Sequence, residues 1–246
     1  MDGLYMLPKL FDEYSLNARV KPALLALLPI VVMVYVFTPS LYSIISALFS
    51  VVVACGFITA LAHYSRYQGA KTEKRLYKSW GGKPTTIILR HTDDLLDNYT
   101  KLRYHKYLSK SINDWSAPTI EDEMVNITAA DKYYDSAVKW LLEKTRNTKI
   151  YDLLFKENIS YGFRRNSRGI KWLGVSLASF SIAMVISIIL MEPKYFDIQI
   201  VGLEVGALIF SIIMLLWWLF IVTDVWVRDA AERYAIRLLA VCENKT

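Results

Sequence analysis

The chain passes from a polar segment into an apolar one through Tyr161-Gly162-Phe163-Arg164-Arg165-Asn166-Ser167-Arg168-Gly169-Ile170-Lys171-Trp172. On a helix, Arg164, Arg168 and Lys171 recur at i, i+4 and i+7, so the three cations share one stripe. Such a stripe at a bilayer surface can hold lipid phosphates or an anionic ligand. It can also be ordinary flanking charge that orients the apolar segment after it, and the residues alone support both interpretations.

Apolar residues make up 54% of the 246 residues, and they are clustered. Four runs approach or exceed the roughly 18–20 residues that a helix needs to cross a bilayer. The runs cover residues 23–37, 41–62, 173–191 and 205–223. The first is short and contains Pro29. We therefore predict an all-α membrane protein with four transmembrane helices and a mostly helical cytoplasmic domain between the second and third.

Lys and Arg are concentrated on one side of the predicted spans. The short connections at 38–40 and 192–197 carry almost none of them, whereas basic residues precede the first span and follow the second and fourth. Because cytoplasmic loops carry an excess of Lys and Arg, we expect both termini and the central domain in the cytoplasm. The predicted divisions are a cytoplasmic amphipathic segment (1–22), a transmembrane hairpin (23–63), a basic cytoplasmic domain (64–172), a second hairpin (173–223) and a C-terminal cytoplasmic helix (224–246).

The central domain carries the basic charge of the chain. Residues 65–171 contain 21 Lys or Arg and 13 Asp or Glu, an excess of eight that is larger than the net charge of +6. A basic face suits anionic lipid, nucleotide or nucleic acid, although a solvated face beside an anionic leaflet needs no partner. Within the domain we predict one strand at 85–89, a helix that starts with a Thr128 cap, and a helix from near Thr148 through the basic stretch, with Gly162 and Gly169 as soft points.

No catalytic or metal-binding pattern stands out. The turn Gly81-Gly82-Lys83-Pro84 lacks the spacing of a phosphate loop, and Pro84 removes a backbone donor. His91 has Asp93 and Asp94 nearby but no second His or Cys at a metal-binding spacing. We therefore expect neither a cofactor nor an enzyme, with a membrane-bound enzyme kept as an alternative.

Polar and small residues interrupt the apolar runs. Ser176, Ser179 and Ser187 fall within one arc of the third predicted span, where they could line a wet path or hydrogen-bond to neighbouring helices. Glu204 is an acid at the outer end of the fourth run, and a carboxylate within the membrane is costly enough to suggest a function unless it lies at the interface. We take these four residues as pore candidates. Gly202-x-x-x-Gly206 permits close contact between helices.

Four stretches together resemble a family of bacterial four-span membrane proteins: Trp80-Gly81-Gly82-Lys83-Pro84-Thr85-Thr86, Lys101-Leu102-Arg103-Tyr104-His105, Val138-Lys139-Trp140-Leu141-Leu142-Glu143-Lys144-Thr145-Arg146 and Tyr161-Gly162-Phe163-Arg164-Arg165-Asn166. With its four-span plan, the chain also resembles the membrane effector of Hailong-type anti-phage systems. In those systems a nucleotidyltransferase makes oligonucleotides that control an oligomeric ion channel. The resemblance implies a homo-oligomer, with a tetramer expected, in the bacterial inner membrane, acting in anti-phage defence by abortive infection.

The same resemblance supplies a single-stranded oligonucleotide as the ligand, and the basic residues supply groups for its phosphates. Tyr104, Tyr161 and Phe163 could stack bases. A membrane-anchored scaffold or binding module for an anionic partner is the alternative to a channel. The candidate phosphate contacts are Arg90, Arg103, Arg164, Arg165 and Lys171.

Overall fold

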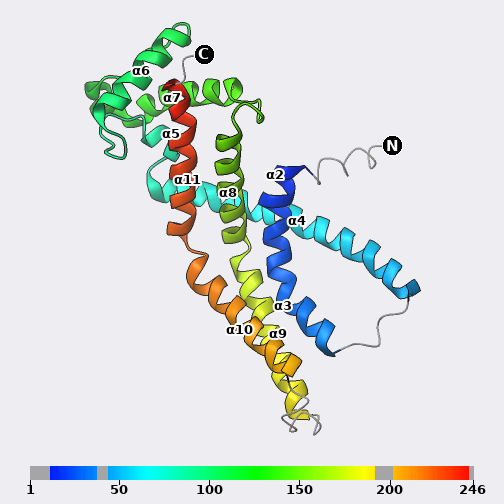
Figure 1. Ribbon diagram of the computed structural model, residues 1–246. Coiled ribbons are helices and arrows are strands. Elements are labelled where there is room, and N and C mark those ends of the chain that lie inside the picture. Colours follow the sequence, from blue (N-terminus) through cyan, green and yellow to red (C-terminus); the bar gives the residue numbers. More distant parts are fainter. Residues whose placement is uncertain (1–11, 38–43, 192–201, 244–246) are drawn as a thin grey trace. The chain divides into compact units, whose positions relative to one another are not determined.

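The computed structural model describes residues 12–37, 44–191 and 202–243, with side chains for all of these except residues 44–55. Within this part every regular element is a helix, which confirms the predicted all-α class (Figure 1). In chain order the helices are α2 (Glu13–Ser15), the π-helix η1 (Leu16–Val20), α3 (Lys21–Phe37), α4 (Ile44–Trp80), α5 (Pro84–Ile87), α6 (Asn98–Ser111), α7 (Ile120–Lys144), α8 (Asp152–Gly169), α9 (Lys171–Met191), α10 (Gly202–Leu216), the π-helix η4 (Trp217–Ile221), α11 (Asp224–Leu239) and the 3-10 helix η5 (Ala240–Glu243).

The chain divides into two compact units, each built from segments that are far apart in the sequence. The apolar unit comprises Met1–Thr72 and Gly162–Val227. The polar unit comprises Glu73–Tyr161 and Arg228–Thr246. Helices α4, α8 and α11 each contribute residues to both units.

Three helical segments of the apolar unit are long and apolar enough to cross a membrane: Glu13–Phe37, Lys171–Met191 and Gly202–Ile221. They contain the first and third predicted spans and most of the fourth. The first segment is longer than predicted because α2, η1 and α3 follow one another without a gap, with Pro29 inside α3. Parts of the prediction lie outside the described residues. They are the start of the second predicted span (41–43), the two short connections (38–40 and 192–197) and most of the N-terminal segment (1–11).

Small residues bring α3, α9 and α10 into contact. Ser181 touches both neighbouring helices, because its hydroxyl donates to the Pro29 carbonyl oxygen at 3.0 Å and lies 3.1 Å from the Ser211 hydroxyl. Trp218 fills the space beside Gly174, where an added Cβ would lie 2.2 Å from the indole ring. The buried faces are Pro22, Ala23, Ala26 and Pro29 on α3; Gly174, Ala178, Ser181 and Val185 on α9; and Glu204, Ala207, Ser211 and Met214 on α10.

The polar unit has its own hydrophobic core. Helices α6, α7 and α11 and the residues just after α5 supply it, and its members are aromatic and aliphatic side chains that recur at helical spacing. Helix α11 and η5 belong to this core, although they follow α6 by more than 100 residues in the sequence. Its fully buried members include Leu89, Leu108, Tyr134, Leu141, Leu238 and Leu239.

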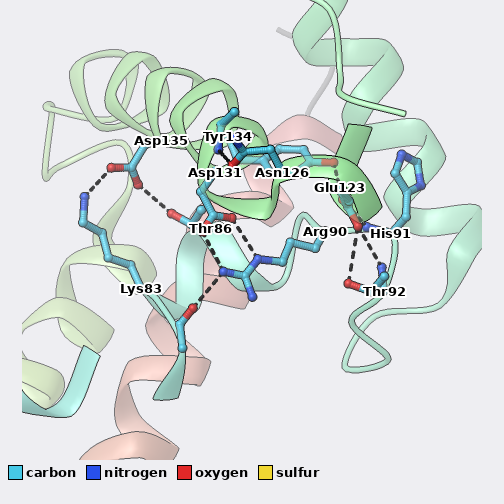
Figure 2. A network of polar contacts seen from close by, with 12 residues as sticks. Lys83, Thr86, Arg90, His91, Thr92, Glu123, Asn126, Asp131, Tyr134 and Asp135 are labelled. Atoms are coloured by element: carbon cyan, nitrogen blue, oxygen red, sulfur yellow. Dashed lines mark hydrogen bonds and ion pairs between the residues drawn. The ribbon is translucent and has the colours of Figure 1, made fainter. Parts of the chain in front are cut away.

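Two acidic side chains of α7 hold the segment around α5 in place (Figure 2). Glu123 is 4% exposed and accepts hydrogen bonds from the His91 amide at 2.8 Å, the Thr92 amide at 3.3 Å and the Tyr134 hydroxyl at 2.7 Å. Asp135 accepts from the Thr86 hydroxyl at 2.6 Å. Because each carboxylate supplies acceptors that water would otherwise provide, the buried donors of this segment are satisfied.

The predicted strand at 85–89 is wrong, because Pro84–Ile87 form the short helix α5. Pro84 stands in the first turn, where its missing N–H costs no hydrogen bond and its fixed φ suits a helix. Ile88 and Leu89 are buried in the core, so the apolar run reflects burial and not a strand.

The helix predicted to start at Thr128 starts earlier. Thr119 and Asp122 form a capping box at the beginning of α7. The helix then bends at Asn126, which has non-helical φ and ψ and whose side chain accepts from the Ala129 amide at 3.0 Å. The expected cap therefore exists in the bend, but Asn126 supplies it and not Thr128.

Candidate functional site at the entry to α9

The basic stretch Tyr161–Trp172 forms the end of α8 and the start of α9. Only Ile170 separates the two helices, and its amide lies 3.2 Å from the Asn166 carbonyl oxygen. Residues 162–172 all belong to the apolar unit, while Tyr161 is the last residue of this segment in the polar unit. Helix α8 therefore leads from the polar unit directly into an apolar helix that is long enough to span a bilayer.

One side of this stretch carries two glycines at points of close packing. A Cβ at Gly162 would lie 2.9 Å from the Ala18 Cβ, and a Cβ at Gly169 would lie 2.5 Å from the backbone nitrogen of Gly69. Such separations leave no room for a side chain. Each glycine therefore allows a neighbouring helix to approach closely. Of the two predicted soft points, Gly169 is the residue at which α8 ends, whereas α8 continues through Gly162.

Asn166 lies between these two glycines on the same side of α8, and it is fully buried. Its Nδ2 donates to the Ala18 carbonyl oxygen at 2.6 Å, and a Cβ at Gly69 would lie 2.0 Å from its Oδ1. The side chain of Asn166 thus bridges η1 and α4. We call this meeting of α8, η1 and α4 the Asn166 junction.

The other side of the stretch carries the basic stripe. Arg164 donates from Nη1 to the Trp226 carbonyl oxygen at 2.9 Å and stacks its guanidinium over the Trp226 ring at 5.1 Å. Arg168 donates from Nε to Asp224 at 2.7 Å. Lys171 donates from Nζ to the carbonyl oxygens of Leu219 and Val222, at 2.9 and 3.1 Å.

We call Arg164, Arg168 and Lys171 the cation clasp. All three reach the segment 219–226, where η4 ends and α11 begins. The last carbonyl groups of a helix have no partner within it and form its negative end, so cations are favoured there. The clasp therefore joins the start of α9 to the segment that follows the apolar helix α10 and η4.

The other predicted phosphate contacts also make bonds within the protein. Arg165 lies beside the Asn166 junction, with its Nε 3.3 Å from the Asn166 Oδ1. Arg90, in the polar unit, makes a two-pronged pair with Asp131, at 2.8 and 2.7 Å. The hydrogen bond to Asp131 raises the pKa of Arg90 above its usual value. Arg103, also in the polar unit, is exposed and pairs with Glu243 at 2.9 Å.

The four predicted pore residues lie on two different faces. Ser176, Ser179 and Ser187 are exposed on α9. At about 100° per residue, their arc is roughly opposite the buried face of that helix. Glu204 instead continues the buried face of α10, and within the described residues its Oε2 atom has no hydrogen-bond partner.

Ser181 and Ser211 were not singled out from the sequence, although they join the three apolar helices. The sequence feature that could have identified them is the helical spacing of small residues on one face. Ser181 shares a face with Ala178 and Val185 on α9, and Ser211 shares a face with Ala207 on α10.

A cavity of about 280 Å³ in the polar unit was also missed. Tyr161 forms one wall, donating to Glu73 at 2.7 Å and stacking on Tyr234 with 6.2 Å between ring centroids. Burial raises the pKa of the Tyr161 hydroxyl above its usual value. Of the other aromatic residues proposed to stack bases, Tyr104 is buried in the core and Phe163 packs edge-on against Trp226.

Comparisons with known proteins add no relative: no family model, no curated protein and no solved structure matches this chain. Among the described residues no group of three or more His, Cys, Asp or Glu side chains is arranged to hold a metal ion.

Proposed function

We propose that the protein is an ion channel of the bacterial inner membrane, formed by several copies of the chain and lined by α9. The observation that carries this proposal is the serine face of α9. A hydroxyl group facing lipid has no water to bond, so a row of three on an apolar helix favours a wet path or a further helix against it. In an oligomer whose α9 helices surround a pore, the serine face meets both the water of the pore and the neighbouring α9 helices.

The entry segment provides the means of gating. Because α8 carries residues of both units, a change in the polar unit reaches the cation clasp through one continuous helix. Lys171, the first residue of α9, is held by carbonyl groups after α10, so moving α8 would alter how α9 meets its neighbour. The proposed signal is a single-stranded oligonucleotide made by a partner nucleotidyltransferase, in anti-phage defence, and it rests on the family resemblance.

In this account the channel has four spans, both termini in the cytoplasm, and a tetrameric assembly. The distribution of Lys and Arg supports the orientation, since the basic residues flank the predicted spans on one side. We propose no catalytic role. A scaffold for an anionic partner is the second candidate, and the excess of positive charge in residues 65–171 favours it as much as it favours a gating ligand.

The ligand part of the proposal is tested by oligonucleotide binding to purified protein over a salt series. The double variant Arg164→Gln/Arg165→Gln should bind a labelled single strand more weakly. Its affinity should also fall less steeply with salt concentration, because fewer phosphate contacts release fewer counterions on binding. Arg168→Gln is the matched control, since it removes a clasp residue that is not a proposed phosphate contact.

The control separates three results. Weaker binding by the double variant alone supports phosphate contacts at these residues. An equal loss in Arg168→Gln would show that the clasp acts only by holding the helices together. Equal affinities and salt slopes in all three proteins would remove Arg164 and Arg165 from the ligand site.

A further inference from the structure

Three helices of the apolar unit bring an arginine to the Asn166 junction. Arg19 follows Ala18, whose carbonyl oxygen accepts from Asn166. Arg165 precedes Asn166 in α8. Arg66 lies one turn before Gly69, the residue against which Asn166 packs. The two contacts that Asn166 makes with Ala18 and Gly69 therefore also bring these three cations near the junction.

Arg66 and Arg165 are each close enough to Arg19 to act unfavourably on its guanidinium, whereas the Asp12 carboxylate acts favourably. The Arg19 guanidinium also lies over the Tyr14 ring, 5.3 Å from its centroid. The Asp12 carboxylate already accepts from the Ser15 amide at 2.9 Å and the Ser15 hydroxyl at 2.8 Å. The positive charge around Arg19 is thus only partly balanced within the described residues.

Two donors near the junction have no acceptor in the described part of the chain. The Arg19 Nε atom is buried and lacks a hydrogen-bond partner, although Nη1 donates to Ser15 at 3.0 Å. The Ser65 hydroxyl, one turn before Gly69 on α4, is also buried without a partner. An incompletely paired guanidinium beside two like charges is costly, so this group of arginines favours a bound anion that compensates their charge.

The position along the helices identifies the source of the anion. Arg19 stands one turn before Ala23, where the first apolar run begins, and Arg66 stands one turn after Ala62, where the second predicted run ends. One turn is about 5.4 Å of helix, which is comparable with the headgroup layer on each side of the hydrocarbon core. Basic pockets between helices at this level suit the phosphate groups of anionic lipids.

We infer that Arg19, Arg66 and Arg165 form a binding site for the phosphate of an anionic phospholipid headgroup. The lipid would neutralise the mutual repulsion of the arginines and stabilise the contact of α8 with η1 and α4. This site goes beyond the proposed channel and does not depend on whether the protein conducts ions. It is also distinct from the cation clasp, which lies on the other side of the same stretch.

The test is a titration of the purified full-length protein with phosphatidylglycerol in detergent, with bound lipid counted by native mass spectrometry. Each lost arginine should weaken binding about fivefold. Arg66→Gln alone should show this loss with an unchanged thermal unfolding temperature, because the Arg66 side chain is exposed and has no hydrogen bond or ion pair with any described residue. Arg19→Gln/Arg66→Gln should lose more than tenfold.

Arg146→Gln is the matched control, because it removes one charge from the polar unit at a side chain that is 81% exposed. It should bind phosphatidylglycerol as the wild type does, and phosphatidylcholine should bind all proteins weakly. Equal phosphatidylglycerol affinity in the wild type and the double variant would overturn the inference. Displacement of the lipid by equimolar inorganic phosphate would also overturn it, because the arginines would then bind free phosphate. A loss confined to binding of a short single-stranded oligonucleotide would assign the arginines to the proposed signal and overturn it as well.

Discussion

Arg168 donates from Nε to the Asp224 carboxylate at 2.7 Å, which joins the last turn of α8 to the first turn of α11. The two residues are 56 positions apart, yet each stands at the helix end that its charge favours: a cation at a C-terminus and an anion at an N-terminus. With Arg164 and Lys171 on the same stripe, this pair links the entry to α9 with the exit of the last apolar helix. It is the most direct single contact through which to test the clasp.

Reversing one charge of this pair should lower the stability of the apolar unit. Arg168→Asp or Asp224→Arg should each cost about 1 kcal/mol, a modest figure because both side chains are partly exposed. The double swap Arg168→Asp/Asp224→Arg should recover part of the loss. Thermal unfolding of the detergent-purified protein measures all three, with Arg146→Asp as the exposed control, and additive losses in the double swap would show that the two residues do not interact.

The glycines should separate into two groups when each is changed to alanine. Gly69→Ala and Gly169→Ala should destabilise the protein by about 1–3 kcal/mol, because the added Cβ would collide with Asn166 or with the backbone around Gly69. Gly202→Ala and Gly206→Ala are matched controls, since no atom of the described residues lies within 4 Å of the added Cβ. They should be neutral or stabilising by up to about 1 kcal/mol. A strong loss at Gly206 would place that face in a helix contact between copies of the chain.

The polar unit should lose stability as the pH falls from about 6.5 to about 4. Burial lowers the pKa of His105 to about 4, while its ordinary value is 6.5. Between these values the unfolded chain binds a proton that the folded unit does not, so unfolding is favoured by up to about 3 kcal/mol as the pH drops. The measurement is hydrogen exchange of α6 peptides, corrected for the intrinsic effect of pH.

His105→Gln should flatten this pH dependence, because the buried titrating group is removed while an amide donor is kept for the Leu89 carbonyl oxygen, which His105 meets at 2.8 Å. His63→Gln, in the apolar unit, serves as the control. If His105→Gln keeps the full pH dependence, another group is responsible for it.

The orientation of the chain is tested by reporter fusions after Lys110 and at Thr246. Both reporters should lie in the cytoplasm, because Lys and Arg flank the predicted spans on one side and favour that side for the central segment and the C-terminus. A signal from outside at either position would exclude the proposed even number of spans or reverse the orientation.

Periodicity and composition predicted much of this fold, because they report properties of single segments. The apolar runs that contain Ala178 and Ala207 were assigned to spans from their length alone, and the structure places both in helices long enough to cross a bilayer. The strand prediction at 85–89 was wrong because Ile88 and Leu89 are fully buried. A short run of apolar residues has no periodicity that separates a strand from a helix.

The candidate site was predicted only in part for a related reason. The spacing of Arg164, Arg168 and Lys171 correctly placed three cations on one stripe, but no local pattern shows that carbonyl groups near residues 219–226 meet them. Likewise Gly162 suggests flexibility when considered alone, and only the contact with Ala18 reveals close packing. Contacts between distant segments are properties of the fold, and a single sequence records them only as unexplained small or polar residues.

Single-channel recording is the most direct test of the proposed function. Purified protein in planar bilayers should give discrete current steps, and a single-stranded oligonucleotide added on the side of the polar unit should change the open probability. Ser176→Val/Ser179→Val should lower the unitary current, because it removes hydroxyls from the exposed face of α9, while Arg146→Gln should leave it unchanged. A flat record with and without oligonucleotide, or a unitary current unaffected by the serine substitutions, would contradict a pore lined by α9.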